Sequence, residues 1–124
     1  MTIRKPGCLA AILIPVAVLA ALYFWLVKWP SRDPAVLQAI RVESVALMAK
    51  HSGHIDIPEA QYPPAIARLG PEGVWVTEHG VTIMIQSEPD GGYMYFIPRT
   101  PADAPRPWAA ITDLGYGVYW ISRH

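Results

Sequence analysis

Few side chains in this sequence have the types and the spacing that chemistry requires. His51 and His54 stand three positions apart, a spacing that could begin a metal site. Zinc needs three or four protein ligands, and neither a third histidine nor a cysteine lies near this pair in the sequence. Glu88 and Asp90 belong to the segment EPDGG, which is typical of a turn and lacks the spaced oxygen ligands of a calcium loop. The sequence therefore predicts no metal and no other cofactor.

The sequence also offers no candidate for covalent catalysis. Gly-x-Ser-x-Gly, the phosphate-binding loop and His-Glu-x-x-His are all absent from it. None of its serines has a neighbour in the sequence that would activate it. Cys8 is the single cysteine, so an intrachain disulfide is excluded, and its place at the start of an apolar stretch differs from that of a lipoprotein cysteine. We predict that this protein is not an enzyme.

Aromatic side chains are the more informative group. Large amphipathic rings are favoured anchors in protein interfaces. If a helix covers one face of a sheet, side-chain alternation leaves several of these aromatics on the other face. The alternative is that the proline-rich segment around Trp108 folds over them as a second small core. The candidate partner-binding residues are Trp75, Tyr93, Tyr95, Trp108 and Tyr119.

The elements that must position these residues begin with an apolar N-terminal stretch. Residues 8–27 contain no charged side chain. A bilayer core about 30 Å thick needs roughly 20 apolar residues at helical rise, and residues 9–29 meet that length. The run is longer than the roughly 7–15 apolar residues of a cleaved signal peptide, and aromatic residues collect at its C-terminal end, as they do at membrane interfaces. We predict that residues 1–29 form an uncleaved signal anchor that spans the membrane once.

Basic residues on both sides of this stretch bear on its orientation. Arg4 and Lys5 precede it, but three basic residues follow it closely, so their count alone does not decide the topology. The free amino terminus and the layout, which is that of a secretory signal, favour a cytoplasmic N-terminus. We therefore predict a bacterial inner-membrane protein with residues 30–124 in the periplasm. These residues hold seven Lys or Arg against ten Asp or Glu, which argues against a nucleic-acid partner.

The first element expected in residues 30–124 is a long amphipathic helix. Asp33 is a good N-cap, Pro34 suits the first helical position, and Gly53 stands just past the expected end. Apolar side chains also occur on the opposite side, at Val42 and Val45. We expect the helix to lie across a sheet, and a second contact surface for another chain is the alternative. Its main apolar stripe consists of Val36, Leu37, Ile40, Leu47 and Met48.

The later part of the chain has the two-residue period of strands. We predict a short helix beginning at Pro63 or Pro64 and ending at Leu69, and then strands at residues 74–78, 81–87, 93–98 and 116–122, the first two joined by a turn at His79 and Gly80. Helices followed by strands indicate an α+β domain with one long helix packed on a small antiparallel sheet of about four strands. The expected core comprises Val36, Ile40, Leu47, Ile66, Leu69, Val74, Val76, Ile83, Ile85, Phe96 and Val118.

An apolar N-terminal helix followed by a small antiparallel sheet is similar in outline to type IV pilins and pseudopilins. That resemblance implies assembly through the N-terminal helix. The processing site of those proteins has Phe after Gly and a Glu at the fifth place, whereas RKPGCLAAIL has Gly7 without either. Pro30 and Pro34 interrupt the continuous helix that pilins use for packing.

These observations favour a tethered binding module. We expect a single-pass membrane protein whose periplasmic domain binds another protein, as a subunit of an envelope complex or as a membrane-held immunity or inhibitor protein. A pilin-like or secretion-system component is the alternative.

Overall fold

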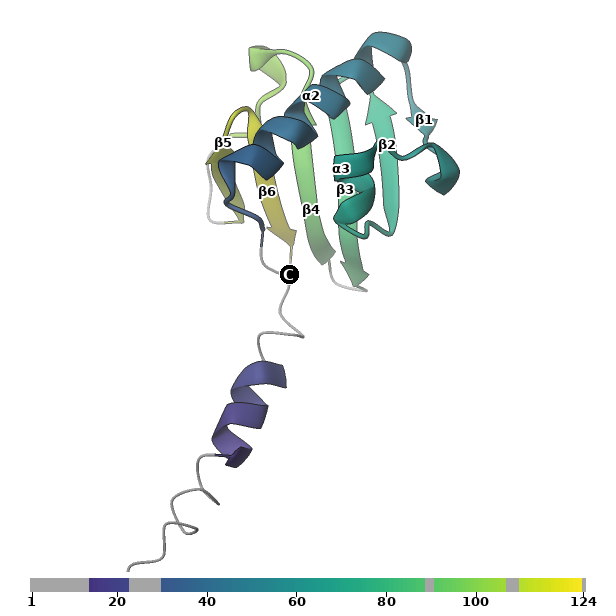
Figure 1. Cartoon of the computed structure of the whole chain (residues 1–124). Coiled ribbons are helices and arrows are strands. Elements are labelled where there is room, and N and C mark those ends of the chain that lie inside the picture. The colour runs from purple at the N-terminus through teal and green to yellow at the C-terminus, as the bar shows by residue number, and fades with distance from the viewer. Residues whose placement is uncertain (1–13, 23–29, 89–90, 107–109, 124) are drawn as a thin grey trace, which may run out of the picture.

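The computed structural model describes residues 14–22, 30–88, 91–106 and 110–123 (Figure 1). Residues 14–22 are helical, and the other residues of the predicted membrane span, 9–13 and 23–29, lie outside the described part of the chain. Within the described residues, no helix has both the length and the apolar character needed to cross a bilayer. The large apolar side chains of residues 14–22 are exposed, namely Ile14, Val16, Val18, Leu19 and Leu22.

The remaining described residues build one antiparallel sheet of six strands in the order β1-β2-β3-β4-β6-β5. The α+β class is confirmed, whereas the expectation of about four strands was wrong. The strands are β1 (Ile55–Asp56), β2 (Gly73–Thr77), β3 (Gly80–Glu88), β4 (Gly91–Pro98), β5 (Ile111–Gly115) and β6 (Val118–Arg123).

The two unexpected strands have different origins. β1 has only two residues, too few to show a period, and it forms because Ile55 pairs with Val76 of β2. β5 was not predicted, and the strand expected over residues 116–122 begins two residues later, as β6 at Val118. Tyr116 and Gly117 instead have φ values of 57° and 73° and form the turn between β5 and β6. Two successive positive φ values suit a two-residue hairpin turn, since they match the twist of the flanking strands.

Helix α2 (Pro34–Lys50) begins as predicted, because the Asp33 carboxylate accepts a hydrogen bond from the Ala35 N–H at 3.0 Å. It ends at the C-cap His51, two residues before Gly53. Its buried face packs against β3 and β6. Val42 and Val45 are exposed on the far side. The side chains buried beneath α2 are Leu37, Ile40, Ser44, Leu47 and Met48.

The short helix α3 (Pro64–Arg68) is attached to α2 by one side chain. Both oxygens of the Glu43 carboxylate accept hydrogen bonds at the start of α3, from Ala65 N–H at 2.9 Å and Ile66 N–H at 3.0 Å. A carboxylate is a strong acceptor for these otherwise unpaired donors. Both helices lie on the same face of the sheet (Figure 1). Two 3₁₀ turns, η1 (Glu59–Gln61) and η2 (Pro101–Asp103), complete the described elements.

The core lies between these helices and the sheet. Seven of the expected core residues are buried, and three more, Val36, Leu69 and Ile85, are partly buried against them. Phe96 is absent from this core because its strand register places it on the opposite face. The buried residues that were expected are Ile40, Leu47, Ile66, Val74, Val76, Ile83 and Val118, and those that were not are Leu37, Met48, Ile57, Val81, Tyr95, Ile97 and Trp120.

Candidate functional site

Strand register sorts the aromatic residues between the two faces of the sheet. Tyr95 pairs with Ile83 on one side and Trp120 on the other, so all three point toward the helices. Tyr95 is 3% exposed and Trp120 is 6% exposed. The expectation that Tyr93 and Tyr95 lie on the helix-free face was therefore wrong, because both share the strand side of the buried Ile97.

Trp75 and Tyr119 do lie on the face that no described helix covers, and we call this the open face (Figure 1). Paired residues bring mainly apolar side chains into two parallel rows across the sheet there. All of these side chains except the buried Thr82 are partly exposed. The first row runs Trp75, Thr82, Phe96 and Tyr119 and ends at the exposed Asp113, and the second runs Met84, Met94, Ile121 and Ile111.

The shape of the open face is set partly by a glycine. A Cβ atom at Gly73 would meet Cζ3 of the Trp75 ring at 3.3 Å, so the indole extends along its own strand over Gly73. A side chain there would lift the ring away from the sheet. The open face therefore combines a flat-lying tryptophan with two unbranched methionines, and methionine adapts its shape to different partner surfaces.

On the helix side, the aromatic residues form a stacked group at one end of the sheet. The Tyr93 and Trp120 rings are stacked with centroids 5.8 Å apart, and Tyr95 meets Trp120 edge-on at 4.9 Å. The Ser31 N–H donates a hydrogen bond of 2.8 Å to the Tyr95 hydroxyl oxygen. Burial raises the pKa of Tyr95, so the phenol stays protonated at neutral pH. Beside this group lies a hollow of about 320 Å³ whose walls include Pro30, Leu69 and Ile85.

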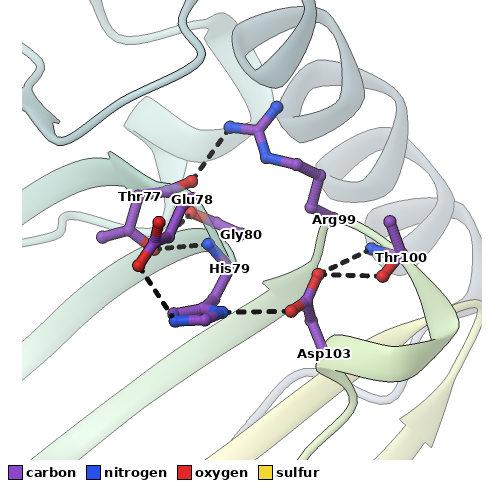
Figure 2. A network of polar contacts seen from close by, with 7 residues as sticks. All are labelled: Thr77, Glu78, His79, Gly80, Arg99, Thr100 and Asp103. Atoms are coloured by element: carbon purple, nitrogen blue, oxygen red, sulfur yellow. Dashed lines mark hydrogen bonds and ion pairs between the residues drawn. The ribbon is translucent and has the colours of Figure 1, made fainter.

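A polar cluster joins the β2–β3 hairpin to the segment after β4 (Figure 2). His79 Nδ1 lies 3.0 Å from Oδ1 of Asp103, and His79 Nε2 lies 3.4 Å from Oε1 of Glu78. The Thr100 hydroxyl donates to Oδ2 of Asp103 at 2.9 Å. The hydrogen bond to Asp103 raises the pKa of His79, and the hydrogen bonds from His79 and Thr100 lower the pKa of Asp103.

This cluster resembles the base and orienting acid of a hydrolase only in part. In a catalytic triad, the second ring nitrogen of the histidine faces a nucleophile. Here that nitrogen faces Glu78, a carboxylate. His54, one of the two histidines considered for a metal, instead lies 3.5 Å from Asp56, and the described residues hold no group of three or more His, Cys, Asp or Glu placed to bind a metal ion. The cluster can form ion pairs, but no nucleophilic side chain faces the second ring nitrogen of His79.

Arg99 is the second feature of this corner. Its guanidinium donates to three main-chain carbonyl oxygens, those of Met48, His51 and Thr77, each at 2.9 Å. The first two belong to the C-terminal end of α2, where carbonyl groups lack helical partners. Arg99 therefore holds the helix against the β2–β3 hairpin.

The open face contains residues that were not among the predicted binding residues, and Trp108 lies outside the described part of the chain. Met84, Met94, Phe96, Ile111 and Ile121 were not proposed for binding. The signal that could have found three of them is alternation: Met84 alternates with the buried Ile83, and Met94 and Phe96 alternate with Tyr95. Ile111 had no such signal, because its strand was not recognised.

Comparison with known proteins adds no assignment. No protein-family model matches this chain, and no curated protein or solved structure is significantly similar to it.

Proposed function

We propose that this chain is a non-enzymatic, single-pass inner-membrane protein whose periplasmic α+β domain binds another protein through the open face. The observation that supports the proposal is the pair of mainly apolar rows across that face. Exposed apolar surfaces that are continuous rather than scattered mark interaction sites. Tryptophan and tyrosine, at Trp75 and Tyr119, are the residue types that dominate binding energy in protein interfaces.

The membrane anchor rests on residues 9–29. Their length and apolar composition match a bilayer span. Residues 14–22, the described part of that stretch, are helical and expose their large apolar side chains. Hydrocarbon is a solvent that such side chains favour over water.

The alternative, assembly through the N-terminal helix as in pilins, has less support. Residues 30–33 are not helical, and α2 begins anew at Pro34. The apolar stretch and α2 therefore do not form one continuous helix.

Site-specific photo-crosslinking of the full-length chain in its native membrane tests the open face. A benzophenone amino acid replaces Met94 or Ile121 on the open face, or Gln38, which is exposed on α2. We expect adducts with a second protein species from Met94 and Ile121 and none from Gln38. Equal labelling from all three positions, or none from the open face, would refute the proposal. Adducts formed only between copies of this chain would show that the open face is an interface between copies and would refute a separate protein partner.

A further inference from the structure

Two adjoining hollows on the helix side of the sheet form a groove beside Pro30 and Ser31, the first described residues of the domain. One has a volume of about 320 Å³ and reaches Tyr95 and Trp120, and the other, of about 380 Å³, lies between α2 and α3. They share the lining residues Ser31, Arg68 and Leu69. Small-molecule sites typically occupy roughly 300–1,000 Å³, so each hollow is large enough to hold part of a ligand. We call the two together the entry groove.

The charge of the entry groove comes from one residue. Arg68 is the only residue with a formal charge among the described residues that line it. Its side chain is exposed, and the ion pairs found in the described part of the chain involve other residues. Glu43, the acidic residue that anchors α3, already accepts hydrogen bonds from the Ala65 and Ile66 N–H groups. The groove therefore presents a cation to an incoming ligand.

The rest of the lining offers few polar partners. Pro30 has no N–H, and the Ser31 N–H already donates to the Tyr95 hydroxyl. A peptide lying in the groove would bring an N–H and a C=O with every residue, and each would lose free energy if left unpaired. An alkyl chain brings no such groups, and its burial is favourable at about 0.8 kcal/mol per methylene.

We propose that the entry groove binds an acyl chain of an anionic membrane phospholipid, with the phosphate of that lipid on Arg68. This inference rests on the proposed membrane anchor, since Pro30 and Ser31 line the groove and directly follow the predicted span. The groove then opens where the domain meets the bilayer, and lipid is supplied at high local concentration. This site is separate from the open face, which is the opposite face of the sheet.

The test uses the full-length chain in phosphatidylcholine nanodiscs that contain phosphatidylglycerol with a diazirine in its acyl chain. After irradiation and digestion, mass spectrometry maps the labelled peptides. We expect label on the peptides that carry Leu69 and Ile85, besides label on residues 9–29. Diazirine-bearing phosphatidylcholine, whose headgroup is zwitterionic, is expected to label the groove several-fold less.

Two matched variants test the role of the cation. Arg68→Gln is expected to reduce groove labelling several-fold, because the phosphate loses its partner. Arg32→Gln removes a nearby exposed charge that lines neither hollow, and it should leave the labelling unchanged. Equal loss in both variants would mean that general electrostatic attraction, and not a site, brings the lipid to the domain.

Labelling of residues 9–29 separates this inference from the proposed anchor. If those residues are labelled and the groove is not, the anchor stands and the lipid site is refuted. If neither is labelled, both are refuted. Groove labelling that responds to Arg68→Gln supports the lipid site even where residues 9–29 carry no label.

Discussion

At the scale of single residues, the His79–Asp103 pair is a contact whose strength depends on pH. The imidazole is 66% exposed whereas the Asp103 carboxyl is 19% exposed, so solvent screens the pair from one side. Both ring nitrogens face carboxylates, of Asp103 and Glu78, which suits the doubly protonated imidazolium. The contact connects the β2–β3 turn with η2, and its contribution to stability should follow the protonation of both partners.

The sign of this pH dependence follows from the two pKa shifts. The pKa of His79 is raised above 6.5, so its contribution is complete below that value and is lost as pH rises through the folded-state pKa. The pKa of Asp103 is lowered below 3.8, so its contribution is present above that value and is lost as pH falls through the folded-state pKa. The pair should therefore stabilise most between these two limits.

His79→Gln tests this window. We expect the difference in free energy of unfolding between the parent chain and His79→Gln to be largest between about pH 4 and about pH 6.5 and to shrink on both sides. Urea denaturation of the full chain in detergent, repeated across this range, measures the difference. His54→Gln, at an exposed histidine 3.5 Å from Asp56, is the control and should leave stability almost unchanged. A pH-independent difference for His79→Gln would contradict the assignment.

At the scale of elements, Arg99 holds three of them together. It follows β4 directly, its guanidinium donates to the end of α2 and to Thr77 of β2, and its own N–H donates to the His79 carbonyl at 2.9 Å. The planar fork of arginine reaches separate carbonyl groups at once, whereas a lysine ammonium is a single point of charge. The docking of α2 at this end depends on that geometry.

Arg99→Lys should destabilise the domain by roughly 1–3 kcal/mol, because at least one partly buried carbonyl group loses its donor. The readout is the midpoint of urea denaturation with an unchanged slope. Arg106→Lys, at an exposed arginine of the same connection, is the matched control and should change stability by less than about 0.5 kcal/mol. Similar losses in both variants would show that the carbonyl contacts of Arg99 contribute little.

At the scale of the whole molecule, the apolar N-terminal stretch and the open face are expected to contact different surroundings. Under the proposed function, the stretch lies in lipid and the open face is covered by a partner protein. Leu19 lies at the middle of residues 9–29, and its side chain is exposed. A charge at the centre of a membrane span costs about 2.5–3.5 kcal/mol on insertion scales.

Leu19→Arg should therefore shift much of the chain from the carbonate-resistant membrane fraction to the soluble fraction. Val42→Arg places the same charge at an exposed apolar position of α2 and should leave the chain in the membrane. Retention of Leu19→Arg at the parental level would count against a membrane span at residues 9–29.

Short-range signals in the sequence predicted the elements that short-range interactions stabilise. Asp33 and Pro34 predicted the start of α2, because capping and a fixed φ act within one turn. Alternation predicted β2, β3 and β4 and part of the core, since a half-buried strand needs apolar side chains at every second position. The α+β class followed from the order of these elements.

Only the tertiary structure decided which face each aromatic residue occupies. Tyr93, Tyr95, Tyr119 and Trp75 are alike in type, and strand pairing alone places two of them under the helices and two on the open face. The same holds for β1, β5 and Arg99, whose partners lie on distant segments of the chain. Pairing register and long-range hydrogen bonds depend on which distant segments of the chain come into contact. The residue types and their spacing within one segment do not determine those contacts.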